Sequence, residues 1–148
     1  MAAAEAGLSP LDVHVPLYVM TSPQTDKETR RYFAEHANFG LPDGDVFFFE
    51  QGTMPCFTED GRFMLQEACL LATSPDGNGG IYRALHLSGA VSDMKRRGVR
   101  MVHVYAVDNL AVRAVDPLFL GLCLQRGADV GSKVCRKRDA SEKVGVLC

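Results

Sequence analysis

The stretch Val46-Phe47-Phe48-Phe49 decides the fold class of this 148-residue chain. Four apolar residues in a row, with no polar residue between them, are typical of a strand covered on both faces, as in a parallel sheet. Two further apolar runs, Leu17–Met20 and Met101–Val107, predict strands of the same kind. Helical segments alternate with these strands along the chain. The sequence therefore predicts an α/β fold, with a mostly parallel sheet and flanking helices.

The helices are recognised by the residues at their ends. Thr25 and Glu28 fit a capping box, which predicts a helix that runs to His36 with Tyr32, Phe33 and His36 toward the core. The remaining predicted elements are a hairpin-like region at 51–71 with a turn at 59–62, helices at 81–85, 90–97 and 118–126, the last capped by Asp116, and strands at 130–135 and 144–148.

Composition and charge narrow the function classes. The net charge is −2 and no cluster of Lys and Arg dominates, which argues against a nucleic-acid-binding surface. The five cysteines form no C-x-x-C pair, so we expect no zinc site and a reducing compartment. The start of the chain does not read as a secretory signal, and no apolar run approaches the roughly 18 residues of a membrane helix. We therefore expect a cytoplasmic protein with a flexible segment at 1–12 and one compact domain at 13–148.

The glycine-rich segment Pro75-Asp76-Gly77-Asn78-Gly79-Gly80 is the first candidate for chemistry. Three glycines in four positions at the start of a helix allow a ligand to approach the backbone closely. The segment lacks the Lys-Ser/Thr pair of a P-loop and the G-x-G-x-x-G spacing of a dinucleotide site. The residues alone leave two readings equally open, a loop that binds an anion or nucleotide and a plain glycine-rich turn.

Two polar residues follow predicted strands. Asp108, in Val107-Asp108-Asn109, comes just past the Met101–Val107 strand, where open α/β sheets bind ligands, and its carboxylate suits Mg²⁺ shared with substrate phosphates. A helix cap or turn is the alternative for Asp108. Gln51 follows the Phe-rich strand, and its amide offers the donor and acceptor needed to read the edge of a base; the alternative is a polar loop residue.

Five segments, taken in order, resemble the eukaryotic UDP-N-acetylglucosamine (UDP-N-acetylhexosamine) pyrophosphorylases. The resemblance extends from about Val15 to the last residue. Each segment alone is weak evidence, whereas five in the same order are a specific signal. The segments are Val15–Ser22, Phe48–Gly52, Pro75–Leu85, His103–Leu110 and Gln125–Asp129.

The resemblance implies a fold, a reaction and roles for four residues. The fold would be a Rossmann-like nucleotide-diphospho-sugar transferase (GT-A-like) fold, and residues 13–148 would be part of its catalytic domain. The reaction would join UTP and N-acetylglucosamine 1-phosphate into UDP-N-acetylglucosamine and pyrophosphate. By motif, Gln51 and Gly77 would hold the uridine and Asn78 would contact the sugar. Asp108 would lie at the nucleotide phosphates as the catalytic residue that helps to hold Mg²⁺ or Mn²⁺.

The resemblance also implies that the chain is an incomplete, central fragment of such an enzyme. The family's phosphate loop, rich in Gly and containing Thr-Arg-Leu-Gly, has no match in residues 1–15, and the apolar strand predicted at 144–148 ends with the chain. Two alternatives to a UDP-N-acetylglucosamine pyrophosphorylase follow. One is a non-catalytic remnant that binds a UDP-sugar or a partner subunit, and the other is a pyrophosphorylase for another UDP-sugar.

Overall fold

Two parallel strands form the centre of the fold. The computed structural model describes residues 14–142, and in it β1 (Leu17–Thr21) pairs with β2 (Val46–Glu50) in register from Leu17 and Val46 to Thr21 and Glu50. Both strands were predicted from their apolar runs, and their parallel pairing agrees with the uninterrupted apolar character of β2. The pairing continues one residue further, because the Gln51 N–H donates to the Thr21 carbonyl at 2.8 Å.

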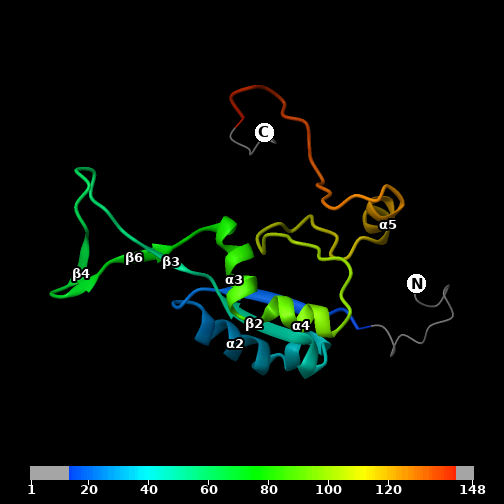
Figure 1. The fold of residues 1–148 in the computed structure, drawn as a ribbon, viewed down its shortest axis with the longest axis horizontal. Helices are drawn as coiled ribbons and strands as arrows, with labels where there is room; N and C mark the ends of the chain where they lie inside the picture. Colours follow the sequence, from blue (N-terminus) through cyan, green and yellow to red (C-terminus); the bar gives the residue numbers. More distant parts are fainter. Residues whose placement is uncertain (1–13, 143–148) are drawn as a thin grey trace. The chain divides into compact units, whose positions relative to one another are not determined.

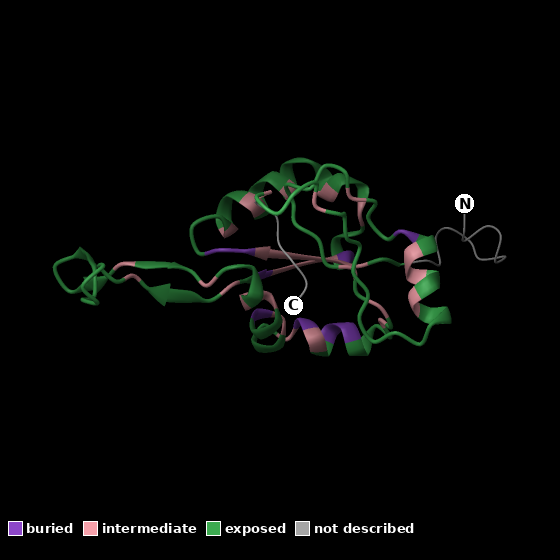
Figure 2. Cartoon of the chain, turned by 90° about the horizontal axis from the view of Figure 1, so that it is seen from above, coloured by how far each residue is buried: buried purple, intermediate pink, exposed green. Residues whose placement is uncertain are grey.

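Helices cover both faces of this strand pair. Helix α2 (Asp26–Glu35) lies on one face, and α3 (Ile81–Leu87) and α4 (Ala90–Arg96) lie on the other (Figures 1 and 2). On the α2 side, Phe33 packs edge-on against Phe48 with 5.1 Å between ring centroids. The buried core lies on the other side, where Phe49 is only 3% exposed; its other buried apolar residues are Ala84, Ala90 and Met94.

The predicted capping box at the start of α2 does not form. Thr25 is the N-cap but already has a helical backbone conformation, and its side chain makes no cap hydrogen bond to the helix. Its hydroxyl oxygen instead accepts from the Ser22 N–H at 3.0 Å. Ser22 competes successfully for this hydroxyl because it is held in the turn that leaves β1, where its carbonyl accepts from the Thr25 and Asp26 N–H groups.

The expected core face of α2 is also only partly correct. Phe33 is half-buried, but Tyr32 is 54% exposed and His36 is exposed as well. These two rings pack on each other with centroids 4.2 Å apart, and His36 stacks on Phe39 of the 3₁₀ segment η2 (Ala37–Gly40). A two-stranded sheet offers too narrow a surface to cover a whole helix face, so these rings cluster outside it.

An antiparallel arm connects β2 to α3. Its base is formed by β3 (Thr53–Pro55) and β6 (Thr73–Pro75), and its outer part by β4 (Leu65–Glu67) and β5 (Leu70–Leu71). The predicted turn at 59–62 is present, with the Gly61 N–H donating to the Thr58 carbonyl at 3.0 Å. The arm extends away from the strand pair, and most of its residues are exposed (Figures 1 and 2). A mostly parallel sheet was expected, whereas among residues 14–142 only β1 and β2 pair in parallel.

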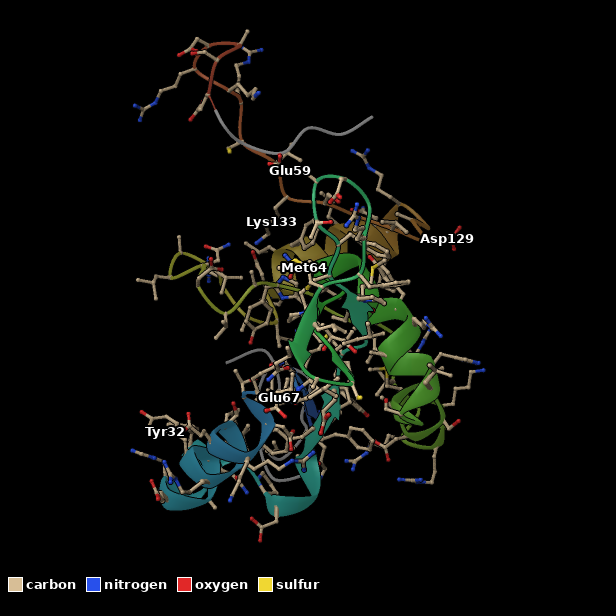
Figure 3. All side chains as sticks on the ribbon, turned by 90° about the vertical axis from the view of Figure 1, so that its left-hand side faces the viewer. Tyr32, Glu59, Met64, Glu67, Asp129 and Lys133 are labelled. Atoms are coloured by element: carbon tan, nitrogen blue, oxygen red, sulfur yellow. The ribbon has the colours of Figure 1, made fainter. Side chains whose placement is uncertain are left out.

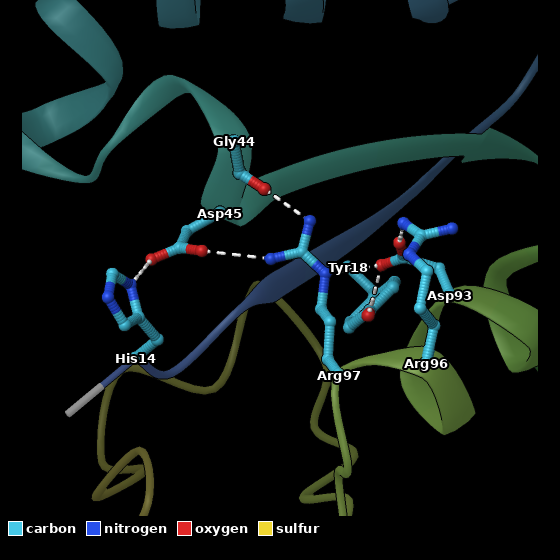
Figure 4. Close-up of polar contacts among 7 residues, drawn as sticks. All are labelled: His14, Tyr18, Gly44, Asp45, Asp93, Arg96 and Arg97. Carbon is cyan, nitrogen blue, oxygen red and sulfur yellow. Dashed lines mark hydrogen bonds and ion pairs between the residues drawn. The ribbon is translucent and has the colours of Figure 1, made fainter. Parts of the chain in front are cut away.

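A network of ion pairs and hydrogen bonds ties α4 to the strand pair (Figure 4). Arg97, just after α4, donates to Asp93 at 2.7 Å and to Asp45 at 2.9 Å. Asp45 belongs to the 3₁₀ segment η3 (Asp43–Asp45), and it also contacts His14 at 2.8 Å. The Tyr18 hydroxyl on β1 donates to Asp93 at 2.7 Å. Both carboxylates are buried yet fully paired, which is the arrangement that makes buried charge tolerable.

The described chain divides into two compact units, with the boundary between Arg100 and Met101. The second unit contains α5 (Pro117–Gln125), which begins as predicted with Asp116 accepting from the Leu118 N–H at 3.1 Å. The strands expected at 101–107 and 130–135 are absent from the described residues, and the strand expected at 144–148 lies outside them. Within residues 14–142, no helix has both the length and the apolar character needed to span a membrane.

The missing strand at Met101–Val107 has a physical reason. An apolar β-branched run forms a strand only when a neighbouring strand satisfies its backbone N–H and C=O groups. Among the described residues this run is paired with no strand, and Val107 is left 96% exposed. The apolar pattern therefore indicated a strand whose hydrogen-bonding partner the described chain does not supply.

Candidate functional site

A cavity of about 580 Å³ lies in the first unit, where β2 ends and α3 begins. Its walls combine apolar side chains of the core with polar groups of both charges. These walls are formed by the end of β2, the residue that follows the arm, one face of α3 and one side chain of α2. The lining residues are Arg30, Phe48, Phe49, Glu50, Gln51, Gly52, Thr53, Asp76, Arg83, Ala84, Leu87 and Ser88.

Gln51 was predicted as a base-reading residue, and the structure places it in the wall of this cavity. Its backbone is held by the hydrogen bond to Thr21, so the residue is fixed at the carboxyl end of the parallel strand pair. This is the edge at which open α/β sheets bind ligands. The half-buried side chain has its amide available to a ligand, because it bonds to no other side chain among residues 14–142. Its role toward a base stays a prediction.

Gly77 and Asn78 do not line the cavity; along the chain they come one and two residues after Asp76, which does. Gly77 has φ 83° and ψ −179°, a conformation that residues with a Cβ rarely adopt. Asn78 then begins the 3₁₀ turn η4 (Asn78–Gly80), and both Gly77 and Asn78 are exposed. The glycine at position 77 is thus required by the backbone, which favours a built loop over an arbitrary glycine-rich turn.

Asp76 carries no role in the sequence-based predictions, although it lies within the glycine-rich segment. Its N–H donates to the Gly52 carbonyl at 3.0 Å, which joins the two ends of the arm across the cavity wall. Its carboxylate is packed against Gly52 and Gly80: a Cβ built on Gly52 would lie 2.6 Å from Asp76 Oδ2, and one on Gly80 would lie 2.2 Å from Asp76 Oδ1. The glycines at 52 and 80 are visible in the sequence, but only the fold shows that both approach the Asp76 carboxylate.

Two arginines in the cavity wall were also missed. Arg30 reaches it from α2; its guanidinium pairs with Asp26 at 2.6 Å and lies 4.8 Å from the centre of the Phe48 ring. Arg83 reaches it from α3 and forms no ion pair with any residue in 14–142. Together with the Glu50 and Asp76 carboxylates, these side chains give the cavity both positive and negative groups. Such a lining suits a ligand that carries anionic groups as well as hydrogen-bond donors.

Asp108 lies in the second unit, apart in the chain from the other three candidates. A strand was predicted to end just before Asp108, but none is present there. Asp108 instead sits in a turn where the Asn109 N–H donates to the Ala106 carbonyl at 3.1 Å. Its side chain is exposed. Within the described residues no group of three or more His, Cys, Asp or Glu side chains gathers around a common point. A single exposed carboxylate fits Mg²⁺ bound mainly through substrate phosphates and water, and does not fit an all-protein metal cage.

Known proteins resemble the chain over nearly its whole length. The family model described as UTP–glucose-1-phosphate uridylyltransferase matches residues 4–148. UDP-N-acetylglucosamine diphosphorylase 1 of Arabidopsis thaliana is 47% identical over 144 residues, which are 97% of this chain and 28% of that protein. UDP-N-acetylglucosamine pyrophosphorylase of Saccharomyces cerevisiae is 43% identical over 136 residues, which are 91% of this chain and 28% of that protein.

A solved structure gives the same result. The uridine diphosphate N-acetylglucosamine pyrophosphorylase from Trypanosoma brucei, crystallised with an inhibitor, matches 98% of this chain and 30% of that chain, with a TM-score of 0.88 and 34% identity. The α/β fold is therefore of the nucleotidyltransferase class. The chain belongs to the UTP–glucose-1-phosphate uridylyltransferase family, and its predicted resemblance to the UDP-N-acetylglucosamine pyrophosphorylases is confirmed. It spans less than a third of the length of these relatives.

Proposed function

We propose that this chain provides the uridine- and amino-sugar-binding part of a uridylyltransferase that makes UDP-N-acetylglucosamine and pyrophosphate from UTP and N-acetylglucosamine 1-phosphate. The observation that supports this most strongly is the 43–47% identity to proteins named for that activity over more than nine tenths of the chain. We also propose that the complete fold is of the Rossmann-like, GT-A-like type.

The reaction is a single uridylyl transfer, from pyrophosphate to the sugar 1-phosphate. A phosphate oxygen of the sugar 1-phosphate attacks the α-phosphorus of UTP, a new P–O bond forms, and the bond from the α-phosphorus to the bridging oxygen breaks. Pyrophosphate leaves with the electron pair of that bond. Such a transfer depends chiefly on positioning the two substrates in line and on neutralising the charge on the phosphates.

Residues of the cavity wall and of the adjoining glycine-rich loop support the positioning role. The Gln51 amide can donate and accept at the edge of a uracil ring, and the backbone at Gly77 is open to close approach by the ligand because no side chain covers it. Asn78, exposed at the start of η4, is available to the sugar. The Arg83 guanidinium adds a positive group in the same wall, which suits an anionic ligand.

The proposed cation is Mg²⁺ or Mn²⁺, with Asp108 as the protein ligand. When bound, the ion would offset the negative charge of the nucleotide phosphates. The chemistry of the donor supports a hard cation, because an exposed carboxylate oxygen is the ligand that Mg²⁺ prefers.

A cytoplasmic location completes the proposal. Its support is that the four described cysteines, Cys56, Cys69, Cys123 and Cys135, are free thiols.

A UTP-dependent assay of pyrophosphate release tests this function. The 148-residue chain and the same chain within a polypeptide of the relatives' length are incubated with Mg²⁺, UTP and one sugar 1-phosphate at a time. N-acetylglucosamine, N-acetylgalactosamine and glucose 1-phosphates are compared, the last because the matched family model is described by it. Highest turnover with N-acetylglucosamine 1-phosphate is the expected result. Highest turnover with glucose 1-phosphate would assign the activity to another UDP-sugar.

A chain that binds a UDP-sugar without catalysis is the second candidate. One observation favours it: the whole cavity is lined by residues of the first unit, so the binding residues do not depend on Asp108. Titration calorimetry of the 148-residue chain with UDP-N-acetylglucosamine and with UTP separates the two candidates. Binding without pyrophosphate release supports the second, and no heat with either compound argues against it.

A further inference from the structure

Asp76 is locked between two glycines that come from opposite ends of the arm. Gly52 precedes β3 and Gly80 ends η4, yet both backbones touch the same carboxylate. Cβ atoms essentially never come within 3.0 Å of such atoms, and added methyl groups at the two glycines would lie 2.6 Å and 2.2 Å from the Asp76 oxygens. The three residues therefore interlock, and the carboxylate sets the spacing between the strand end and the glycine loop.

The interlock sets the relative position of residues proposed to bind the ligand. Gln51 is bonded directly to Gly52, and Gly77 directly to Asp76. The backbone hydrogen bond from Asp76 to Gly52 and the pairing of Thr53 with Pro75 close the same junction from the arm side. A shift of the Asp76 side chain would thus change the distance between Gln51 and Gly77, and with it the fit of any ligand that touches both.

The Asp76 carboxylate does not serve stability in an obvious way. Its Oδ1 atom is buried and has no hydrogen-bond partner within residues 14–142. A buried acceptor without a partner costs free energy, so a residue kept there for folding alone would be a poor choice. A buried polar atom without a partner calls for an explanation, and a role at the adjoining site is one.

We propose that Asp76 is a positioning residue of the ligand site: wedged between Gly52 and Gly80, its side chain holds Gln51 and the Gly77–Asn78 loop at the spacing that the ligand requires. This inference rests on the proposed function, because the ligand used to test it is UDP-N-acetylglucosamine. It goes beyond that function in assigning to Asp76, Gly52 and Gly80 a role that acts through the spacing between Gln51 and the Gly77–Asn78 loop.

A double-mutant cycle tests the interlock. Asp76→Ala, Gly80→Ala and the double variant are compared with the wild type by calorimetric titration with UDP-N-acetylglucosamine and by urea unfolding. Gly44→Ala is the matched control, because Gly44 also lies in a 3₁₀ segment, η3, has nothing within 4 Å of an added Cβ and no positive φ, and does not line the cavity. Asp76→Asn retains the shape of the side chain and serves as the conservative variant.

Asp76→Ala is expected to weaken binding at least tenfold without lowering the stability of the fold, while Asp76→Asn stays within about threefold of the wild type. Gly80→Ala should also weaken binding at least tenfold, but should add little when Asp76 is already Ala, because the methyl group then has no carboxylate to meet. Gly44→Ala should bind as the wild type does.

Three outcomes count against the inference and are distinguishable. Equal binding by wild type and Asp76→Ala would overturn the positioning role while leaving the proposed function intact. A parallel loss of stability and binding in Asp76→Ala would assign Asp76 to folding instead. Absence of binding by the wild type itself would overturn the proposed function, and with it the ligand role of Asp76.

Discussion

The Tyr18 hydroxyl on β1 donates a hydrogen bond of 2.7 Å to Asp93 Oδ2 on α4, 75 residues further along the chain. Burial of the phenol, followed by this hydrogen bond and by the charge of Asp93, raises the pKa of Tyr18 from 10.0 to about 12. The contact joins the strand pair to the helix layer that bears the buried core (Figure 4). It also makes the stability of the first unit depend on pH at both ends of the scale.

Tyr18→Phe should lower the free energy of unfolding by about 1.5–3 kcal/mol at neutral pH, because it removes one hydrogen bond to a charged acceptor. Since the pKa of Tyr18 is raised in the folded state, its contribution is fully present below pH 10 and is lost as the pH rises from 10 toward 12. The difference between wild type and variant in urea unfolding should therefore shrink over that range.

Tyr32→Phe is the matched control for this measurement. Tyr32 lies on the outer side of α2 with 54% of its surface exposed (Figure 3). Its substitution should leave both the stability and the alkaline profile close to those of the wild type. A Tyr18→Phe variant that keeps the full alkaline loss of the wild type would show that another group is responsible.

Asp93→Asn probes the acidic side of the same contact. The Tyr18 hydrogen bond, and after it the bonds and charges of Arg97, hold the pKa of the Asp93 carboxyl below its ordinary value of 3.8. A carboxyl with a lowered folded-state pKa stabilises the fold above its unfolded pKa and loses that contribution as the pH falls through the folded pKa. Asp93→Asn should thus be clearly destabilised at pH 7, and the gap to the wild type should narrow below about pH 4.

Chemical unfolding at pH 7, 5 and 3 measures this gap. Glu59→Gln, which neutralises an exposed carboxyl on the arm, controls for the loss of a surface charge (Figure 3). The decline of the wild type at low pH should not vanish in Asp93→Asn, because Asp26 and Asp116 also have lowered pKa values. A gap of constant size from pH 7 to pH 3 would rule out Asp93 as a titrating contributor.

Gly77→Ala should be destabilising although space for the methyl group exists. Nothing lies within 4 Å of a Cβ built at position 77, so the cost comes from the backbone conformation at φ 83° and ψ −179°. Holding a non-glycine residue there costs about 1–3 kcal/mol. Gly79→Ala in the same turn should cost much less. Unfolding midpoints of the two variants decide the matter, and equal midpoints would mean that the loop adapts to either residue.

Local patterns predicted the elements that are stabilised within short stretches of chain. The Asp116-Pro117 helix start and the glycine at 77 depend on neighbours in sequence or on an intrinsic backbone preference, and the apolar runs of β1 and β2 form strands because each supplies the other's partner. The predictions at Met101–Val107 and at Thr25 were wrong because their outcome depended on competition. A strand needs a partner strand, and the Thr25 hydroxyl had the Ser22 N–H as an alternative donor.

The candidate site likewise contains residues that the local sequence predicted and residues that only contacts between distant segments reveal. Gln51 could be placed at a strand end from the sequence, and the structure puts it in the cavity wall. The contact of Asp76 with Gly52 brings together positions separated by the entire arm, which no pattern within either segment could indicate. The arginines at 30 and 83 likewise reach the cavity from two helices on opposite faces of the strand pair.

Asp108→Ala should reduce turnover far more than stability. The exposed carboxylate makes no side-chain contact that supports the fold among the described residues, so its loss should leave the unfolding midpoint almost unchanged. If Asp108 holds the cation at the phosphates, the rate of pyrophosphate release in a polypeptide of the relatives' length should fall on the order of a hundredfold, the usual effect of removing one group that stabilises transition-state charge. The Mg²⁺ concentration needed for half-maximal rate should rise as well, since the ion loses its protein ligand. Glu59→Ala removes an exposed carboxylate elsewhere and should change neither value. An unchanged rate and Mg²⁺ dependence in Asp108→Ala would remove Asp108 from the proposed metal site.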